Sequence, residues 1–277
     1  NLEDPSSLEG VLKVKLLGEE AGVVAAVSTS AVAVGMGGVG KTCALRAIGR
    51  DREIHQRFTD GVYWLSLGQD AEDTQVIDQV AEIVHDSGGI RISNNIRSMT
   101  NVSSATREAG RWFAGRCCLF LCDDLWRTRS RSKGYFYVLN DLVDEDKGAR
   151  MLCSTRDQEI AKLTEAEHQV QFGSRAPEEA KAIICRYSGF RLDEITLCDE
   201  NTREAFTFVV ERCAGLPLAL SIAGLSVADL SRTSESRGDA WKVYQSQLED
   251  TSAWAHPLIE DEAGPHPGLS AALTASL

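Results

Sequence analysis

The residues with the clearest chemistry lie in the stretch 35–42, where glycines precede a lysine and a threonine. Gly35, Gly40, Lys41 and Thr42 match the pattern G-x-x-x-x-G-K-[ST] of a phosphate-binding loop. Glycine lets the backbone turn so that successive N–H groups face one anion. In such loops the lysine reaches the β- and γ-phosphates and the hydroxyl binds Mg²⁺. The pattern therefore predicts a nucleotide site whose cofactors are ATP or ADP and Mg²⁺.

The alternative interpretation of this stretch is a glycine-rich turn that matches the pattern by chance. A small apolar run, 31–34, precedes the glycines and a helical pattern begins at Lys41, which is the order that a phosphate-binding loop requires. This context favours the nucleotide site. The residues expected to contact the nucleotide are Gly35, Met36, Gly37, Gly38, Val39, Gly40, Lys41, Thr42 and Cys43.

Two aspartates follow a second apolar run, in the sequence CCLFLCDDLW at 117–126. Such a continuous run is typical of a strand buried on both faces in a parallel sheet, where ligands bind at the carboxyl ends of the strands. We expect Asp123 to bind Mg²⁺ together with Thr42, and Asp124 to orient or deprotonate the attacking water. Strand-end aspartates can also form turns or cap helices.

An arginine follows a third apolar run, 149–155. Arg156 at this strand end is suited to contact a γ-phosphate, because a guanidinium binds phosphate oxygens through paired hydrogen bonds. It could then distinguish ATP from ADP, whereas the alternative is an ordinary surface arginine. Lys41, Asp124 and Arg156 are the candidate catalytic residues.

The elements that must position these residues alternate between strands and helices in the first part of the chain. Strands are expected at 31–34, 62–66, 117–126, 149–155 and 168–172, and helices at 6–20, from 41 onward, at 73–88 and at 106–114. The polar stretch 88–104 has no clear period and is expected to be a flexible loop. His85 and Asp86 near a helix end are interpreted as a solvated terminus and not as a catalytic pair.

From Ala176 onward the pattern is helical, with Pro177 placed to begin the first helix. The sequence therefore predicts an α/β fold in which a parallel sheet is flanked by helices and followed by a small all-helical subdomain. We expect a nucleotide-binding domain over 1–175, the helical subdomain over 176–255, and a proline-marked linker with a further segment over 256–277. The chain is expected to be a fragment of a longer protein.

Composition limits the partners and the compartment. The 277 residues carry a formal net charge of -12, which argues against broad nucleic-acid binding. No apolar run is long enough to span a membrane and the N-terminus lacks a signal-peptide pattern, so a soluble, cytoplasmic protein is expected. The eight cysteines contain no C-x-x-C pair and are expected to be reduced, mostly buried thiols.

Four motifs in order, GMGGVGKT, CLFLCDDLW, STR at 154–156 and GLPLAL at 215–220, resemble the NB-ARC domain over residues 8–255. This domain is the nucleotide switch of plant disease-resistance receptors and apoptotic-protease activators, in the STAND class of P-loop ATPases. The resemblance implies the strand order of AAA+ ATPases, with the STR strand between the other two motif-bearing strands. It also implies that Leu216 and Pro217 approach the adenine.

The resemblance further implies an ATP/ADP switch with slow Mg²⁺-dependent hydrolysis, in which nucleotide state sets how the helical subdomain packs. The implied partners are domains of the same protein, namely a signalling domain, a repeat sensor and a winged helix that would begin within 256–277, and other copies of the chain in an active oligomer. The alternatives are a scaffold stabilised by ADP without significant hydrolysis, or a P-loop ATPase regulator outside immunity.

Overall fold

The computed structural model describes residues 2, 7–18, 30–34, 37–126, 135–144, 148–163, 169–234 and 236–252. Contacts divide the chain into two units, described separately below. The first comprises Asn1–Gly35 and Lys41–Phe172, and the second Met36–Gly40 and Gly173–Leu277. The expected nucleotide contacts Gly35 and Met36, and the expected linker and further segment at 256–277, lie outside the described residues.

The first unit is built on a five-stranded parallel sheet with the order β2-β3-β4-β1-β5. The strands are β1 (Ser30–Val34), β2 (Gly61–Ser66), β3 (Cys118–Asp123), β4 (Arg150–Thr155) and β5 (Gln169–Gln171). All six residues of β3 are buried, as expected for an interior parallel strand. The predicted fold class is confirmed, including the position of the STR strand β4 between β1 and β3.

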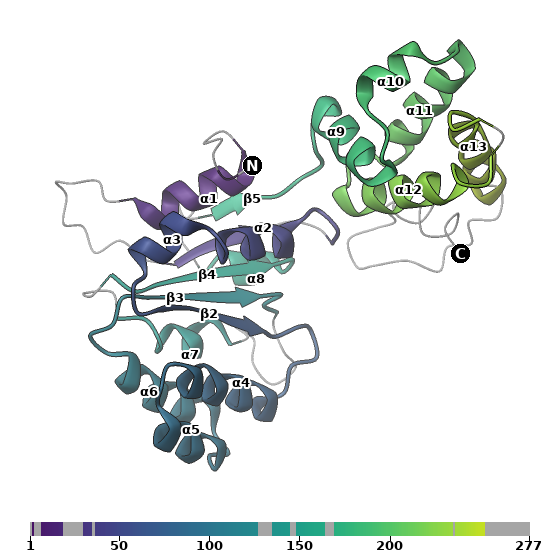
Figure 1. Ribbon diagram of the computed structural model, residues 1–277. Coiled ribbons are helices and arrows are strands. Elements are labelled where there is room, and N and C mark those ends of the chain that lie inside the picture. Colours follow the sequence, from purple (N-terminus) through teal and green to yellow (C-terminus); the bar gives the residue numbers. More distant parts are fainter. Residues whose placement is uncertain are drawn as a thin grey trace. The chain divides into compact units, whose positions relative to one another are not determined.

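Helices cover both faces of this sheet (Figure 1). They are α1 (Leu8–Leu17), α2 (Lys41–Ile48), α3 (Arg52–Arg57), α4 (Asp73–Asp86), α5 (Ile90–Arg97), α6 (Val102–Phe113), α7 (Phe136–Asn140) and α8 (Gln158–Ala161). Alternate strand residues point to opposite faces. Phe120 and Cys122 of β3 join a core with α4, α5 and α6, whereas Leu121 points to the other face, against Gly49 at the end of α2.

The prediction of a flexible loop over 88–104 was wrong. This stretch forms α5 and the first turn of α6, with Asn101 as the N-cap whose side chain accepts a hydrogen bond from the Ser104 N–H. Ile96 and Val102 are fully buried in the core shared with α4 and α6. Tertiary packing of these few apolar side chains therefore outweighs the low helix propensity of the serines and asparagines around them.

The end of the edge strand β2 is bonded to α4 through one side chain. The Gln79 amide accepts a hydrogen bond from the Ser66 N–H and donates one to the Ser66 carbonyl, both at 2.7 Å. Among the described strands β2 pairs only with β3, so these are the backbone groups that face away from the sheet. Gln79 takes the place of a neighbouring strand at that position.

The second unit contains five described helices, α9 (Pro177–Ser188), α10 (Leu192–Leu197), α11 (Glu200–Arg212), α12 (Pro217–Leu230) and α13 (Asp239–Ser252). Trp241 is fully buried at its centre, with Phe190 and Phe206 at ring distances of 5.5 and 5.0 Å. Pro177 and Pro217 each begin a helix, where the missing N–H needs no acceptor.

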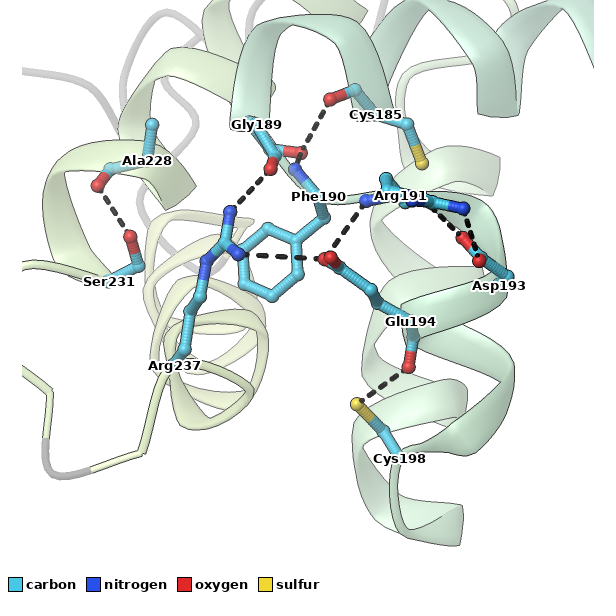
Figure 2. A network of polar contacts seen from close by, with 11 residues as sticks. Cys185, Gly189, Phe190, Arg191, Asp193, Glu194, Cys198, Ala228, Ser231 and Arg237 are labelled. Atoms are coloured by element: carbon cyan, nitrogen blue, oxygen red, sulfur yellow. Dashed lines mark hydrogen bonds and ion pairs between the residues drawn. The ribbon is translucent and has the colours of Figure 1, made fainter.

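A network of polar contacts joins the α9–α10 turn to the chain before α13 (Figure 2). Arg237 donates to the Gly189 carbonyl, lies 3.5 Å from the Glu194 carboxylate, and stacks over the Phe190 ring at 4.3 Å. Gly189 has φ +70°, which a glycine adopts without strain as it ends α9. One arginine thus ties the α9–α10 turn to the chain leading into α13.

Candidate functional site

The phosphate-binding pattern leads directly into α2, which begins at Lys41 as the sequence predicts. Gly38 and Gly40 have φ of +77° and +98°, a left-handed region that side chains disfavour. The Gly38 carbonyl accepts a hydrogen bond of 3.1 Å from the Leu218 N–H. Val39 is fully buried. The glycines therefore allow a tight turn that presents the N-terminus of α2, where backbone N–H groups favour an anion.

Asp123 is the polar centre of the site in the first unit. Its Oδ1 atom accepts hydrogen bonds from Thr42 Oγ1 at 3.0 Å and from Ser154 Oγ at 2.6 Å. Only 6% of Asp123 is exposed. A hydroxyl and a carboxylate are hard oxygen ligands of the kind that Mg²⁺ prefers, and Mg²⁺ keeps several waters beside one or two such protein ligands. The donor set of Thr42 and Asp123 therefore fits this ion.

Asp124 lies at the end of β3 in a constrained backbone conformation. Its φ is +55°, uncommon for a non-glycine residue although aspartate tolerates it better than most. Its N–H donates to Ser154 Oγ at 2.8 Å, and its carbonyl accepts from the Gly68 N–H at 2.9 Å. These two bonds fix the left-handed turn. The Asp124 side chain is about one third exposed and therefore accessible to water.

Arg156 pairs with Asp124 in this structure, with 3.6 Å between Nε and Oδ1. The ends of β3 and β4 bring them together. The Leu125 N–H donates to the Ser154 carbonyl at 2.8 Å, and Thr155 Oγ1 donates to the Leu125 carbonyl at 2.6 Å. The chain beyond each strand is therefore held beside the other, so that Arg156 is on the same edge of the sheet as both aspartates.

Lys41 carries an unusual protonation equilibrium. It is 6% exposed, and burial lowers its pKa to about 8, with the positive charge of Arg156 as the next cause. Asp124 and Asp123 act in the opposite direction and only partly compensate. A buried ammonium beside a guanidinium is electrostatically unfavourable, and a polyanion between them would relieve that repulsion. The charge arrangement suits phosphate groups.

The structure brings five of the sequence-predicted residues together in the first unit: Lys41, Thr42, Asp123, Asp124 and Arg156. Gly37, Gly38, Val39 and Gly40 belong to the second unit, as do Leu216 and Pro217, the N-cap and first residue of α12. Cys43 is exposed on α2. Ser154 was missed as a site residue, although it stands in the STR motif, because a serine in an apolar strand gives no sign of which carboxylate it will contact.

Two other predictions concern residues outside this site. The thiols of all eight cysteines are free, and five of them are buried, as predicted. His85 and Asp86 are both half exposed or more at the end of α4 and 3.5 Å apart, which agrees with a solvated helix terminus. In the part of the chain that the structure describes, none of the helices has the length and apolar character needed to cross a membrane.

Comparison with known proteins identifies related sequences. The family model described as NB-ARC domain matches residues 11–192. Curated relatives from Arabidopsis thaliana include Disease resistance RPP13-like protein 4, 23% identical over 195 residues, which are 69% of this chain and 21% of that protein. A probable disease resistance protein of the same plant is 27% identical over 196 residues, covering 70% and 21%. The alignments thus span about a fifth of these relatives' length.

Among solved structures, the chain is similar to a RuvB variant of Thermotoga maritima, with 14% identity, coverage of 88% of this chain and 68% of that one, and a TM-score of 0.46. PCH-2 of C. elegans gives 9% identity, 89% and 67% coverage, and a TM-score of 0.47. The family assignment rests on the sequence match, which covers well over half of the chain and includes Lys41, Asp123 and Arg156. The chain belongs to the NB-ARC family and is a nucleotide-binding module of the kind found in plant disease-resistance proteins.

Proposed function

We propose that this chain is an ATP/ADP switch that hydrolyses ATP slowly with Mg²⁺. The observation that carries the proposal is the convergence of Lys41, Thr42, Asp123, Asp124 and Arg156 at one edge of the sheet. These are the residue types that phosphoryl transfer needs, because it depends on positioning and on neutralising the charge of the phosphates. Family membership supports nucleotide binding independently of this geometry.

In the proposed site Lys41 binds the β- and γ-phosphates, and Thr42 with Asp123 holds Mg²⁺. Mg²⁺ bound there would supply positive charge that offsets the charge of the phosphates. Asp124 accepts a proton from the attacking water or orients that water, which its partial exposure permits. Arg156 contacts the γ-phosphate, so ATP and ADP would differ in their contacts with the protein. A ligand-driven switch requires such a difference in affinity between states.

We further propose that nucleotide state alters the packing of the helical unit, with Leu216 and Pro217 contacting the adenine. The whole protein would be a cytoplasmic receptor of the disease-resistance type that oligomerises when active. Support comes from the relatives' names and from their length, since the aligned part is about a fifth of each.

The Arg156–Asp124 pair favours a second candidate, a scaffold stabilised by bound ADP. A carboxylate that is held by a guanidinium is less available to orient an attacking water. If the pair persists with nucleotide bound, hydrolysis would be negligible, and ADP would stabilise the fold by mass action alone.

The first experiment compares the purified wild type with a Lys41→Ala variant. Each is denatured and the released nucleotide is separated by ion-exchange chromatography. We expect ADP at close to one equivalent in the wild type and its loss in the variant. A wild type that is empty, and that also fails to bind added Mg·ATP, would exclude the proposal. Phosphate release from added ATP then separates the switch from the scaffold, which would bind ADP and release no phosphate.

A further inference from the structure

Trp126 follows the aspartate pair and is not among the residues proposed to bind the nucleotide or Mg²⁺. Its place is set by the bonds that join the ends of β3 and β4. The Leu125 carbonyl accepts a hydrogen bond from Thr155 Oγ1, and the Leu125 N–H donates to Ser154. Trp126 and Arg156 are the next residues along their chains. The bonds that link Leu125 to Ser154 and Thr155 therefore bring the indole and the guanidinium close together.

The Arg156 guanidinium lies over the Trp126 ring, with 5.7 Å from Cζ to the centroid. The same side chain also pairs with Asp124, with 3.6 Å between Arg156 Nε and Asp124 Oδ1. A guanidinium is attracted to the face of an indole and stacks on it. The Arg156 side chain is 42% exposed and has several rotatable bonds, so without such contacts it would adopt many rotamers. The ring and the carboxylate together restrict it to one region of the site.

The polar group of Trp126 does not explain the residue's presence. Its Nε1 atom is buried and hydrogen-bonds to nothing in the described part of the chain. Burying an unpaired N–H is unfavourable, and an aliphatic side chain would fill space without that cost. What the indole offers over an aliphatic side chain at this position is its ring face, and Arg156 lies over that face.

We propose that Trp126 is a positioning residue that holds Arg156 where a γ-phosphate would be contacted. This inference rests on the proposed function and names the part of the site that sets the preference between ATP and ADP. Trp126 acts through Arg156 and touches no phosphate itself. Its removal therefore weakens ATP binding and leaves ADP binding unchanged, because ADP lacks the γ-phosphate.

The test measures affinity for ADP and for a non-hydrolysable ATP analogue, both with Mg²⁺, by isothermal titration calorimetry. The proteins are the wild type, Trp126→Leu, Trp126→Phe, Arg156→Gln and the double variant Trp126→Leu/Arg156→Gln. We expect Trp126→Leu to weaken binding of the analogue about tenfold and to leave ADP binding within about twofold. Trp126→Phe keeps an aromatic face and should restore most of the loss. The double variant should bind the analogue no more weakly than Arg156→Gln alone.

Several outcomes overturn the inference. Equal weakening of both nucleotides by Trp126→Leu would show a structural role, as would no restoration by phenylalanine or an additive loss in the double variant. If Trp126→Leu fails to fold, Trp126→Phe should still show a smaller loss of affinity that is confined to the ATP analogue. An unchanged ratio of the affinities for the analogue and for ADP in Trp126→Phe would also overturn the inference. A wild type that binds neither nucleotide, or an Arg156→Gln variant with an unchanged ratio, refutes the proposed function first and this inference with it.

Discussion

The two units each contain a network of polar contacts, and the networks differ in where they place charge. At the ends of β3 and β4 the bonds converge on the buried carboxylate of Asp123, beside the buried ammonium of Lys41. In the helical unit, Arg237 and Glu194 are each about half exposed while they join a turn to the chain before α13 (Figure 2).

This difference separates a functional arrangement from a structural one. Burial and the nearby charge of Arg156 lower the pKa of Lys41, and perturbed pKa values of this kind are common at functional sites. The exposed contacts of Arg237 are screened by water, so each adds little, and their main effect is to fix chain direction. Substitutions in the two networks should therefore act on different properties.

The largest expected effect is on hydrolysis, through Asp124→Asn. Asparagine tolerates the left-handed φ of +55°, so the backbone is retained while the base is removed. Loss of a general base lowers rates by about 100-fold or more. We expect phosphate release in single-turnover assays to fall by that factor, with ATP affinity nearly unchanged. Asp78→Asn on the exposed side of α4 is the matched control. Equal rates in both variants would show that Asp124 is not the base.

Asp123→Asn should reduce the effect of Mg²⁺ on nucleotide binding. The substitution keeps the shape and an acceptor for Thr42 and Ser154 but removes the charge that a divalent ion needs. The gain in ATP affinity on adding Mg²⁺ should fall about tenfold, on the scale of losing one charge-assisted contact. Calorimetry in EDTA and in Mg²⁺ measures this gain. If the gain is as large in the variant as in the wild type, the metal is not held by Asp123.

The pH dependence of ATP affinity should report the lowered pKa of Lys41, about 8. Bound phosphates favour the charged lysine, so affinity should be constant below pH 8 and fall up to about tenfold per pH unit above it. For the nucleotide-free protein the sign is reversed. The unfolded lysine binds a proton up to its ordinary pKa of 10.5, so this group's contribution to stability rises between pH 8 and 10.5.

Lys41→Arg is the control for this titration, because arginine stays charged throughout the range. The difference between the two pH profiles isolates the contribution of Lys41. Profiles of identical slope would mean that Lys41 is not the titrating group.

The smallest effect is expected in the helical unit. Arg237→Ala removes a stacking contact on Phe190 and a hydrogen bond to Gly189, and should lower the free energy of unfolding by about 1 kcal/mol. Nucleotide affinity should not change. Arg232→Ala, which breaks an exposed pair with Asp229 at 2.9 Å, is the control and should cost less than about 0.5 kcal/mol. Urea denaturation followed by circular dichroism measures both. A shift in nucleotide affinity with Arg237→Ala would remove the distinction between the networks.

The sequence predicted the sheet and the residues at its carboxyl edge because these depend on local signals. Residue type and order alone indicate a continuous apolar strand such as β3. The same holds for the glycine-rich loop before Lys41. The contacts that complete the site depend on register between distant strands. Neither the bond from Ser154 to Asp123 nor the stacking of Arg156 on Trp126 can be inferred until β3 and β4 are known to pair.

The helices that the sequence missed have weak local signals. In α5, Ser93 is fully buried and Ile90 is exposed, so the order of polar and apolar residues misrepresents which face is inside. In α3 only Ile54 is buried, and the helix depends on Asp51, which caps it and also pairs with Lys13 of α1 at 2.9 Å. Both helices are thus fixed by packing against other segments, which no local pattern encodes.

Gln79 has a consequence for assembly. An edge strand offers unpaired backbone groups to any other extended chain, which is a route to aggregation. Because the Gln79 amide already occupies both groups of Ser66, an incoming strand could not extend its pairing to that end of β2 without displacing this side chain. Gln79 therefore protects this end of β2 from pairing with another extended chain.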